Sequence, residues 1–300
     1  MTVRLANLTA ADIAAERARL PRMFSRSPAE LVRSWFGWGC ALALTVYSLH
    51  RFGFLSGDFL HGASKFASVV VAQLFPPKGF ANLPEFVKVM GETIAMAFIG
   101  TLLGAVFAFP LSFFASKNMT RSRPLQFGTR RFADLLRSFD YLIWALIFVR
   151  AIGLGPLAGI MAIAIVETGT FIKLYSEAIE NLDRKQVDGV TAVGGNGLQR
   201  IRFGVLPQVL PMMLSNTLYM FEHNVRSASI LGIVGAGGIG FLLADRLRAY
   251  ELQEACLIII LIVITVYAID YLSKVLREQL IGDHKRREVV DDAVQDVTVK

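Results

Sequence analysis

The stretch TIAMAFIGTLLGAVFAFPLSFFAS, residues 93–116, decides the fold. Its 24 residues include no charged side chain, whereas an α-helix needs about 20 apolar residues to cross the hydrocarbon core of a bilayer. Residues 257–269 form a second run without a charge. The sequence therefore predicts an all-α fold that crosses a membrane more than once, which is a polytopic integral membrane protein.

The composition of the 300 residues agrees with this prediction. Hydrophobic side chains make up 54% of the chain and charged ones 18%, and the mean hydropathy is +0.51. Soluble domains carry about 25% charged residues. This balance excludes a secreted disulfide scaffold, a disordered tail protein and a soluble nucleotide-binding enzyme. We expect no metal site, because the two cysteines and four histidines lack ligand spacing.

Apolar runs and their Pro and Gly boundaries predict about six transmembrane helices. The expected spans are residues 35–54, 86–115, 132–152, 157–174, 212–235 and 254–272. The domain organisation follows from them. We expect an N-terminal arm over 1–34, a first helix with an outer loop over 35–85, a core over 86–275 and a tail over 276–300.

The lysine and arginine residues predict which side of the membrane each segment faces. Residues 1–34, 116–137, 173–202 and 273–300 hold six, six, five and six of them, whereas the loops on the other side hold six together. Cytoplasmic loops are enriched in these residues. Both termini are therefore expected in the cytoplasm, and the net charge of +7 indicates orientation and not a nucleic-acid footprint.

One expected cytoplasmic loop, residues 186–211, reads QVDGVTAVGGNGLQRIRFGVLPQVLP. It predicts a short helix over residues 186–193 that ends at Gly194, because glycine adopts the left-handed conformation at little cost. A glycine-rich turn then leads to a second amphipathic stretch. Pro207 and Pro211 mark the start of the fifth span.

This loop resembles the EAA loop of binding-protein-dependent ABC importer permeases, which reads Glu-Ala-Ala, three residues, Gly, nine residues, Ile-x-Leu-Pro. Asp188 stands at the position of the Glu, and Gly204 replaces the Ile. Gly189 and Val190 replace the two alanines. The candidate residues for coupling to an ATPase are Asp188, Gly189, Ala192, Gly194, Leu206 and Pro207.

Four further strings resemble the phosphonate-importer permease family, of the PhnE type. They are YLIWALIFV at 141–149, GLGP at 153–156, GVLPQVLP at 204–211 and YMFEHNVRSASILGIVGAGGIG at 219–240. The resemblance covers about residues 86–275. It implies the type I ABC importer fold, also called MetI-like, and uptake of phosphonates or related phosphorus oxyanions.

The same resemblance implies the partners. They are two copies of an ABC ATPase in the cytoplasm, a solute-binding protein outside and a second permease copy, identical or paralogous. The two permease copies are expected in the lipid bilayer of a bacterial inner membrane. In the family the loop at about 186–207 sits in a groove of the ATPase and transmits its closure. The sequence has no Gly-x-x-x-x-Gly-Lys-Ser/Thr motif. We therefore expect a transport subunit that is not an enzyme, with no cofactor of its own and with ATP and Mg on the ATPase.

Charged residues inside the expected spans are candidate pathway residues, because a charge near mid-membrane costs about 2.5–3.5 kcal/mol unless it is paired. Glu222 and Arg226 are four residues apart, which favours an ion pair within the helix. At 100° per residue they share a polar face of about 80° with their neighbours. Such a face lines a translocation pathway or forms a structural network. The candidates are Ser215, Tyr219, Glu222, Arg226, Ser229 and Glu167.

The segment GAGGIG, residues 235–240, fits the pattern G-x-G-x-x-G. A dinucleotide site also needs a soluble strand, helix and strand, and here apolar spans flank the glycines. We expect helix packing or an outer gate instead, formed by Gly235, Gly237, Gly238 and Gly240. The alternative function for the whole chain is a secondary transporter of a small anion driven by an ion gradient. The sequence shows no inverted repeat that would favour it.

Overall fold

The structure is a computed structural model that describes residues 28–54, 57–69, 75 and 77–298. Most of the expected N-terminal arm, residues 1–27, lies outside the described residues. The chain forms two compact units, Met1–Val71 and Ala72–Lys300. The described part of the first unit contains α3 (Pro28–Arg51) and α4 (Gly57–Ser68).

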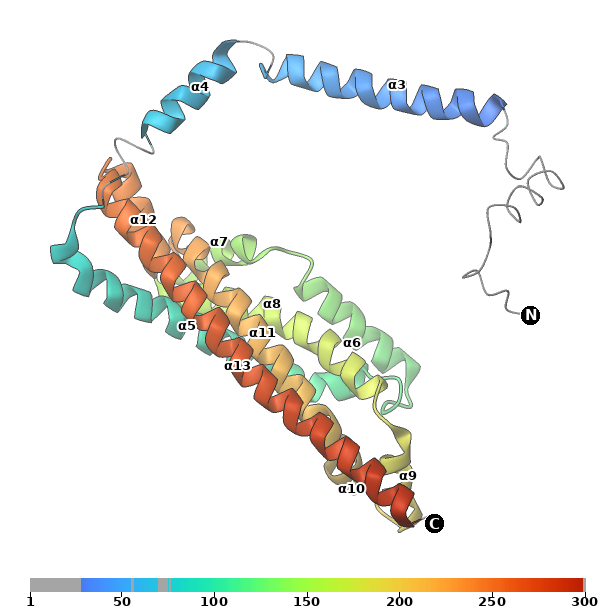
Figure 1. The fold of residues 1–300 in the computed structure, drawn as a ribbon. Coiled ribbons are helices and arrows are strands. Elements are labelled where there is room, and N and C mark those ends of the chain that lie inside the picture. Colours follow the sequence, from blue (N-terminus) through green and yellow to red (C-terminus); the bar gives the residue numbers. More distant parts are fainter. Residues whose placement is uncertain (1–27, 55–56, 70–74, 76, 299–300) are drawn as a thin grey trace. The chain divides into compact units, whose positions relative to one another are not determined.

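The second unit carries the helices of the expected core and the expected loop (Figure 1). In chain order its elements are η3 (Phe80–Asn82), α5 (Leu83–Ala115), α6 (Arg123–Leu136), α7 (Tyr141–Ile152), α8 (Pro156–Glu180), α9 (Arg184–Ala192), α10 (Gly197–Gln199), the π-helix η4 (Arg200–Val205), α11 (Leu206–Leu231), η5 (Gly232–Val234), α12 (Ile239–Arg248) and α13 (Leu252–Thr298). The described residues contain no strand, as the all-α prediction requires.

The expected third span, residues 132–152, is wrong as a single helix. Helix α6 ends at Leu136, and α7 begins after Asp140, whose side chain accepts a hydrogen bond from the backbone N–H of Leu142 at 3.1 Å. Aspartate favours this N-cap position over a helix interior. The 12 residues of α7 span about 18 Å at 1.5 Å per residue, which is shorter than the roughly 30 Å hydrocarbon core.

Three described helical segments are long and apolar enough to cross a membrane: Phe80–Ala115, Pro156–Glu180 and Leu252–Gln279. A fourth is possible if Gly197–Val234 and Ile239–Arg248, which are bent by 44° relative to each other, count as one span. The six-span count is therefore not confirmed within the described residues. Helix α3 is not among these segments, although its 24 residues contain positions 35–51 of the expected first span.

Helices α5 and α8 approach closely where glycines of α5 face side chains of α8. A Cβ atom on Gly100 would lie 2.8 Å from the Cβ of Ile163, and one on Gly104 would lie 2.6 Å from the Cβ of Glu167. Two glycines four residues apart form the small-x-x-x-small pattern that lets membrane helices approach closely. The pair α5 and α8 forms the most extensive helix contact of the unit.

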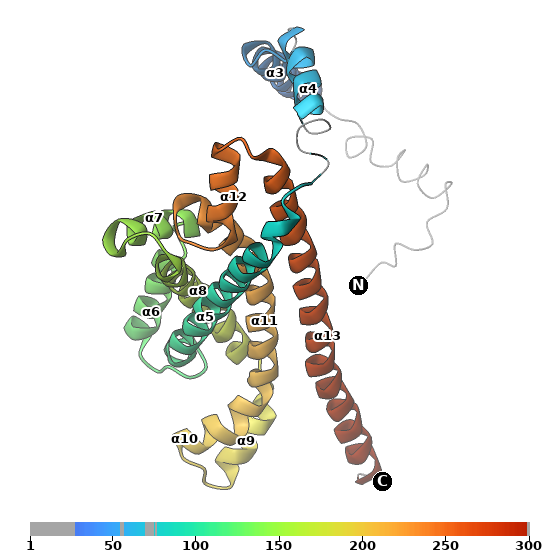
Figure 2. The ribbon, with the colours of Figure 1, turned by 90° about the vertical axis from the view of Figure 1, so that its left-hand side faces the viewer.

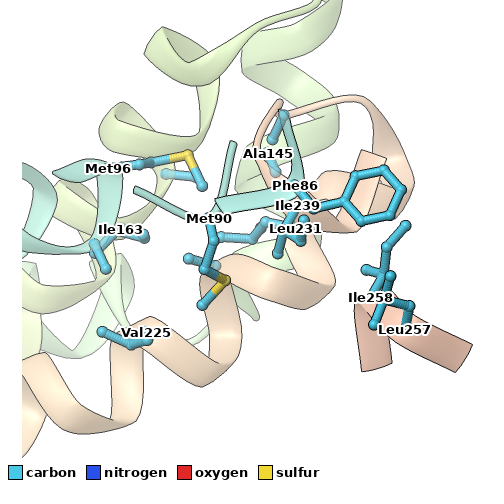
Figure 3. Packing of buried hydrophobic residues seen from close by; sticks show 14 residues of the cluster. Phe86, Met90, Met96, Ala145, Ile163, Val225, Leu231, Ile239, Leu257 and Ile258 are labelled. Carbon is cyan, nitrogen blue, oxygen red and sulfur yellow. The ribbon is translucent and has the colours of Figure 1, made fainter. Parts of the chain in front are cut away.

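The core of the second unit consists of two apolar clusters. The first gathers Met90 and Met96 of α5, Ile163 of α8 and Leu231 of α11, among others (Figure 3). The second lies further along α5 and α8 and includes Phe171 of α8. Between them lie buried polar residues of the same helices, so the core is apolar, then polar, then apolar along the helix axes.

The two ends of α11 carry different structures. Figure 2 shows α9 and α10 at one end of α11 and α12 at the other. We call these the α9 end and the α12 end. Helix α13 packs against α11 and runs beside it in both ribbon views (Figures 1 and 2). This arrangement separates the expected ATPase-coupling residues from the expected outer glycines.

Candidate functional site

The loop at the α9 end is a built structure and not a flexible link. The side chain of Asp183 accepts a hydrogen bond from the backbone N–H of Lys185 at 3.0 Å and so caps α9. Gln208, in the first turn of α11, accepts from the backbone N–H of Asp183 at 3.1 Å. The amide of Gln208 also donates to the carbonyl of Gly204 at 2.6 Å. The start of α9 is thereby tied to the start of α11.

Gly194 ends α9 in the conformation that the sequence predicts, with φ of +82°. Its N–H donates to the carbonyl of Thr191 at 3.0 Å. The chain then turns into α10, which opens with a capping box: the side chain of Asn196 accepts from the N–H of Gln199, and the side chain of Gln199 accepts from the N–H of Asn196. Each hydrogen bond pairs a backbone donor that would otherwise have no partner.

The structure gives a physical reason for glycine at position 204, where the EAA pattern has isoleucine. A Cβ atom there would lie 3.0 Å from the Cα of Val187 on α9. Gly204 and Val205 are both buried. The absent side chain therefore allows α9 to fold back against η4, which makes α9, α10 and η4 one compact unit at the start of α11.

The expected coupling residues are brought together on this unit. Asp188, Gly189, Ala192 and Gly194 are exposed, and so is Pro207, whereas Leu206 is half-buried. Sequence reasoning missed the two most exposed apolar side chains of the unit, which are Val193 at 86% and Leu198 at 79% exposure. Their signal was available, since both are aliphatic residues beside the glycine-rich turn of an otherwise polar loop.

The charges of the fifth expected span pair differently from the prediction. The prediction of an ion pair between Glu222 and Arg226 within α11 is wrong. Arg226 Nη2 lies 3.3 Å from Asp270 Oδ2, and Glu222 Oε2 lies 2.9 Å from Arg277 Nη2. Both partners belong to α13, and both were missed. Asp270 and Arg277 are seven residues apart, about two helical turns, so the sequence did place two opposite charges on one face of the last helix.

The other residues of the expected polar face of α11 divide by burial. Ser215 and Ser229 are buried, at 7% and 8% exposure, whereas Tyr219 is 53% exposed. The guanidinium of Arg277 lies 5.6 Å from the centre of the Tyr219 ring. The side chain of Arg226 is 55% exposed and that of Asp270 34%. The middle of this face is therefore open in the single chain, while its two serines pack inside.

Glu167 does not join these charges but lies in a separate buried polar layer. It is fully buried on α8, and the hydroxyl of Tyr141 on α7 donates to its Oε1 at 2.6 Å. Asn224 of α11 is also fully buried, and its amide donates to Thr101 Oγ1 of α5 at 2.9 Å. Among the described residues, Glu167 Oε2 and Asn224 Oδ1 have no hydrogen-bond partner. The layer joins four helices between the two apolar clusters.

The four glycines at the α12 end lie in tight contacts. A Cβ on Gly237 would lie 2.7 Å from the backbone nitrogen of Pro156, and one on Gly238 would lie 2.6 Å from Thr93 Oγ1. A Cβ on Gly235 would overlap the side chain of Leu154, and one on Gly240 would overlap the backbone of Ser229. The backbone at 235–240 is thereby pressed against α5 and the turn that precedes α8.

Taken together, the site is that of a membrane transport subunit. It combines a helical unit with exposed apolar residues at one end and intramembrane charge pairs along the middle. The described residues hold no group of three or more side chains suited to a metal ion. The chain belongs to the family of binding-protein-dependent transport system inner membrane components, whose profile matches residues 100–281. It is a permease subunit without an ATPase site of its own.

Relatives with known names fall in the same family. The chain is 35% identical to the phosphite transport system permease protein PtxC of Stutzerimonas stutzeri over 227 residues, which are 75% of this chain and 82% of that one. It is 36% identical to the phosphate-import permease protein PhnE of Mycolicibacterium smegmatis over 212 residues, which are 71% of this chain but 40% of that longer one.

The fold has relatives among solved structures. A chain of the MetNI methionine ABC transporter in an inward-facing conformation aligns with a TM-score of 0.60 at 20% identity, and the alignment covers 68% of this chain and 99% of that one. At this identity the likeness concerns the fold alone. It agrees with the MetI-like fold that the sequence resemblance implies.

Proposed function

We propose that this permease imports phosphonates or closely related phosphorus oxyanions, driven by ATP hydrolysis on a separate subunit. The names of the relatives support this substrate class, since one is a phosphite permease and one a phosphate-import permease. The ATP-driven part rests on the compact group of α9, α10 and η4 at the start of α11. It presents Val193 and Leu198, 86% and 79% exposed, at one end of the membrane-spanning helices.

The proposed assembly contains two permease copies, two ATPase subunits that bind ATP and Mg, and a solute-binding protein. The α9 end and both termini face the cytoplasm, and the α12 end faces the binding protein. Lysine and arginine placement supports this orientation. In the assembly Val193 and Leu198 are buried against the ATPase, because removing aliphatic side chains from water at an interface contributes favourable free energy to binding.

The mechanism follows from the ties between α9 and α11. Gln208 joins the start of α9 to the first turn of α11, and α9 packs on η4 through Gly204. When the ATPases close, a displacement of α9 moves α11 as one body with it. Asp188, Gly189, Ala192 and Gly194, together with Leu206 and Pro207, form this coupling element.

The charge pairs between α11 and α13 are the proposed contacts of the passing anion. Arg226 keeps a half-exposed guanidinium beside Asp270. The nearby carboxylate limits how tightly Arg226 can hold an anion, which suits a pathway that must release it. Ser215, Tyr219 and Ser229 belong to the same helix face. Gly235, Gly237, Gly238 and Gly240 serve as packing residues at the outer end.

The coupling proposal is tested by co-purification with the ATPase. Leu198→Asp and Val193→Asp each place a charge on the proposed contact without touching the core. We expect ATPase recovery to fall at least about ten-fold, as for loss of an apolar anchor at an interface. Tyr250→Asp is the matched control, because Tyr250 is 86% exposed near the opposite end and aspartate tolerates its φ of +59°. Full ATPase recovery with both loop variants would contradict the proposal.

The substrate proposal is tested by uptake of a labelled phosphonate into cells that depend on this permease. Unlabelled phosphonate and phosphite should compete, with sulfate as the control anion. Uptake should stop when the ATPase is inactivated. Competition by sulfate as strong as by phosphonate would contradict the substrate class, and uptake that persists without the ATPase would contradict the ATP-driven mechanism.

A further inference from the structure

A cavity between α6 and α8 is lined mainly by charged side chains. Its volume is about 210 Å³, far more than the roughly 10–15 Å³ that one water molecule occupies by a comparable measure. The charged side chains that line it are Arg130, Arg131, Asp134, Arg137, Lys173 and Glu177. Four are basic and two are acidic, and Glu180, which does not line the cavity, pairs with Arg130. One positive charge therefore remains in excess.

The acidic residues of the cavity do not neutralise it. Asp134 is shared by two arginines, with Arg131 Nη1 at 3.1 Å and Arg137 Nη2 at 2.9 Å. Lys173 lies 3.9 Å from Glu177, a long and exposed pair that contributes little. An anion that enters the cavity therefore meets guanidinium and ammonium groups whose charge is only partly balanced.

Helix α6, whose charged side chains line the cavity, also carries exposed apolar side chains that do not line it. This helix is strongly amphipathic, and its Phe132 and Leu135 are 48% and 60% exposed. An amphipathic helix with arginines on one face and Phe and Leu on the other is typical of the membrane interface. Basic pockets between membrane helices on the cytoplasmic side suit the phosphate groups of anionic lipids.

We infer that this cavity is a binding site for a phosphate group, carried by the headgroup of an anionic phospholipid or present as free phosphate. The site is distinct from the charge pairs of α11 and α13. It lies close to the coupling element. Arg130, in its lining, bonds to Glu180, and Glu180 Oε1 accepts from the backbone N–H of Lys117 at 2.7 Å. Asn118, the next residue, accepts from Arg184, the first residue of α9, at 3.1 Å.

The test titrates the full-length permease, purified in neutral detergent, with short-chain phosphatidylglycerol and, in a separate arm, with inorganic phosphate. Phosphatidylcholine of the same chain length is the control ligand. Arg131→Gln and Lys173→Gln each remove one exposed charge and should weaken binding about five-fold. Glu177→Gln removes an acidic residue and should strengthen binding by a similar factor, a gain that misfolding cannot produce.

Arg123→Gln is the matched control variant, because Arg123 is an exposed arginine of α6 that does not line the cavity. It should change the affinity less than about two-fold. If phosphatidylglycerol shows this pattern, the ligand is a lipid headgroup; if inorganic phosphate shows it, the ligand is free phosphate. The inference is overturned if neither binds saturably, if Arg123→Gln weakens binding as much as Arg131→Gln, or if Glu177→Gln fails to strengthen it. No ATPase is present, so the result is independent of the transport mechanism.

Discussion

Two sets of ionisable side chains lie within the membrane-spanning helices, and they differ in burial. Glu167 is fully enclosed among α5, α7, α8 and α11, with one hydrogen bond from Tyr141. Arg226 pairs with Asp270 across α11 and α13, and its side chain is 55% exposed in the single chain. A charge inside a membrane helix can therefore serve the packing of one chain, or it can face outward to a pathway or a second copy.

A substitution in the buried layer should lower stability more than one in the exposed pair. Glu167→Ala leaves Tyr141 without its acceptor and opens a cavity, which together cost about 2–4 kcal/mol. For a unit of this size we expect the melting temperature in detergent to fall by about 5–15 °C. Thermal unfolding of the purified permease measures this.

Glu167→Gln is the matched control for that prediction. Glutamine has nearly the same volume and keeps an oxygen that accepts from Tyr141. It should retain most of the stability that Glu167→Ala loses. Equal melting temperatures for the two variants would mean that the polar contacts of position 167 do not hold the helices.

Gly104 of α5 lies directly against Glu167 of α8. Gly104→Ala forces a Cβ to within 2.6 Å of the Cβ of Glu167, so we expect a loss of about 1–3 kcal/mol from overpacking. Gly91→Ala, on the same helix, meets nothing within 4 Å and should be neutral or stabilising by up to about 1 kcal/mol. The melting temperatures of the two variants measure this difference in stability. A similar change in both would contradict the close contact of α5 and α8.

The exposed pair should have the smallest effect on stability. Arg226→Gln removes an ion pair whose members are 55% and 34% exposed, and such pairs contribute less than about 1 kcal/mol. The melting temperature should change by no more than about 3 °C. A shift as large as that of Glu167→Ala would place Arg226 in the packing of the chain and not on an open face.

Much of this fold could be predicted from the sequence where a local signal decides it. The charge-free stretch at 93–116 lies within α5, and Gly194 ends α9 as expected because glycine alone adopts its φ of +82° easily. The pair Gly100 and Gly104 was missed, although its spacing predicts the contact of α5 with α8. The break between α6 and α7 was missed because residues 132–152 are apolar on average, and this average hides that Asp140 caps a new helix.

Pairings between distant helices could not be predicted in the same way. The spacing of Glu222 and Arg226 favours a local ion pair, yet each residue pairs with α13 because the two helices pack side by side. Glu167 was grouped with these charges only because it too lies inside a span. In the structure Glu167 lies apart from these charges. The residue pattern of α8 alone cannot predict that Tyr141 of α7 and Asn224 of α11 lie beside Glu167.

We propose that the exposed pair of Arg226 and Asp270 serves transport, whereas the buried layer around Glu167 serves packing. The most direct test is ATP-driven uptake of labelled phosphonate per folded permease, measured for Arg226→Gln and Glu167→Gln at matched amounts of protein in the membrane. We predict that Arg226→Gln lowers uptake at least about ten-fold with an unchanged melting temperature, and that Glu167→Gln retains at least about half of it. Full uptake by Arg226→Gln together with loss of uptake by a stably folded Glu167→Gln would contradict the account.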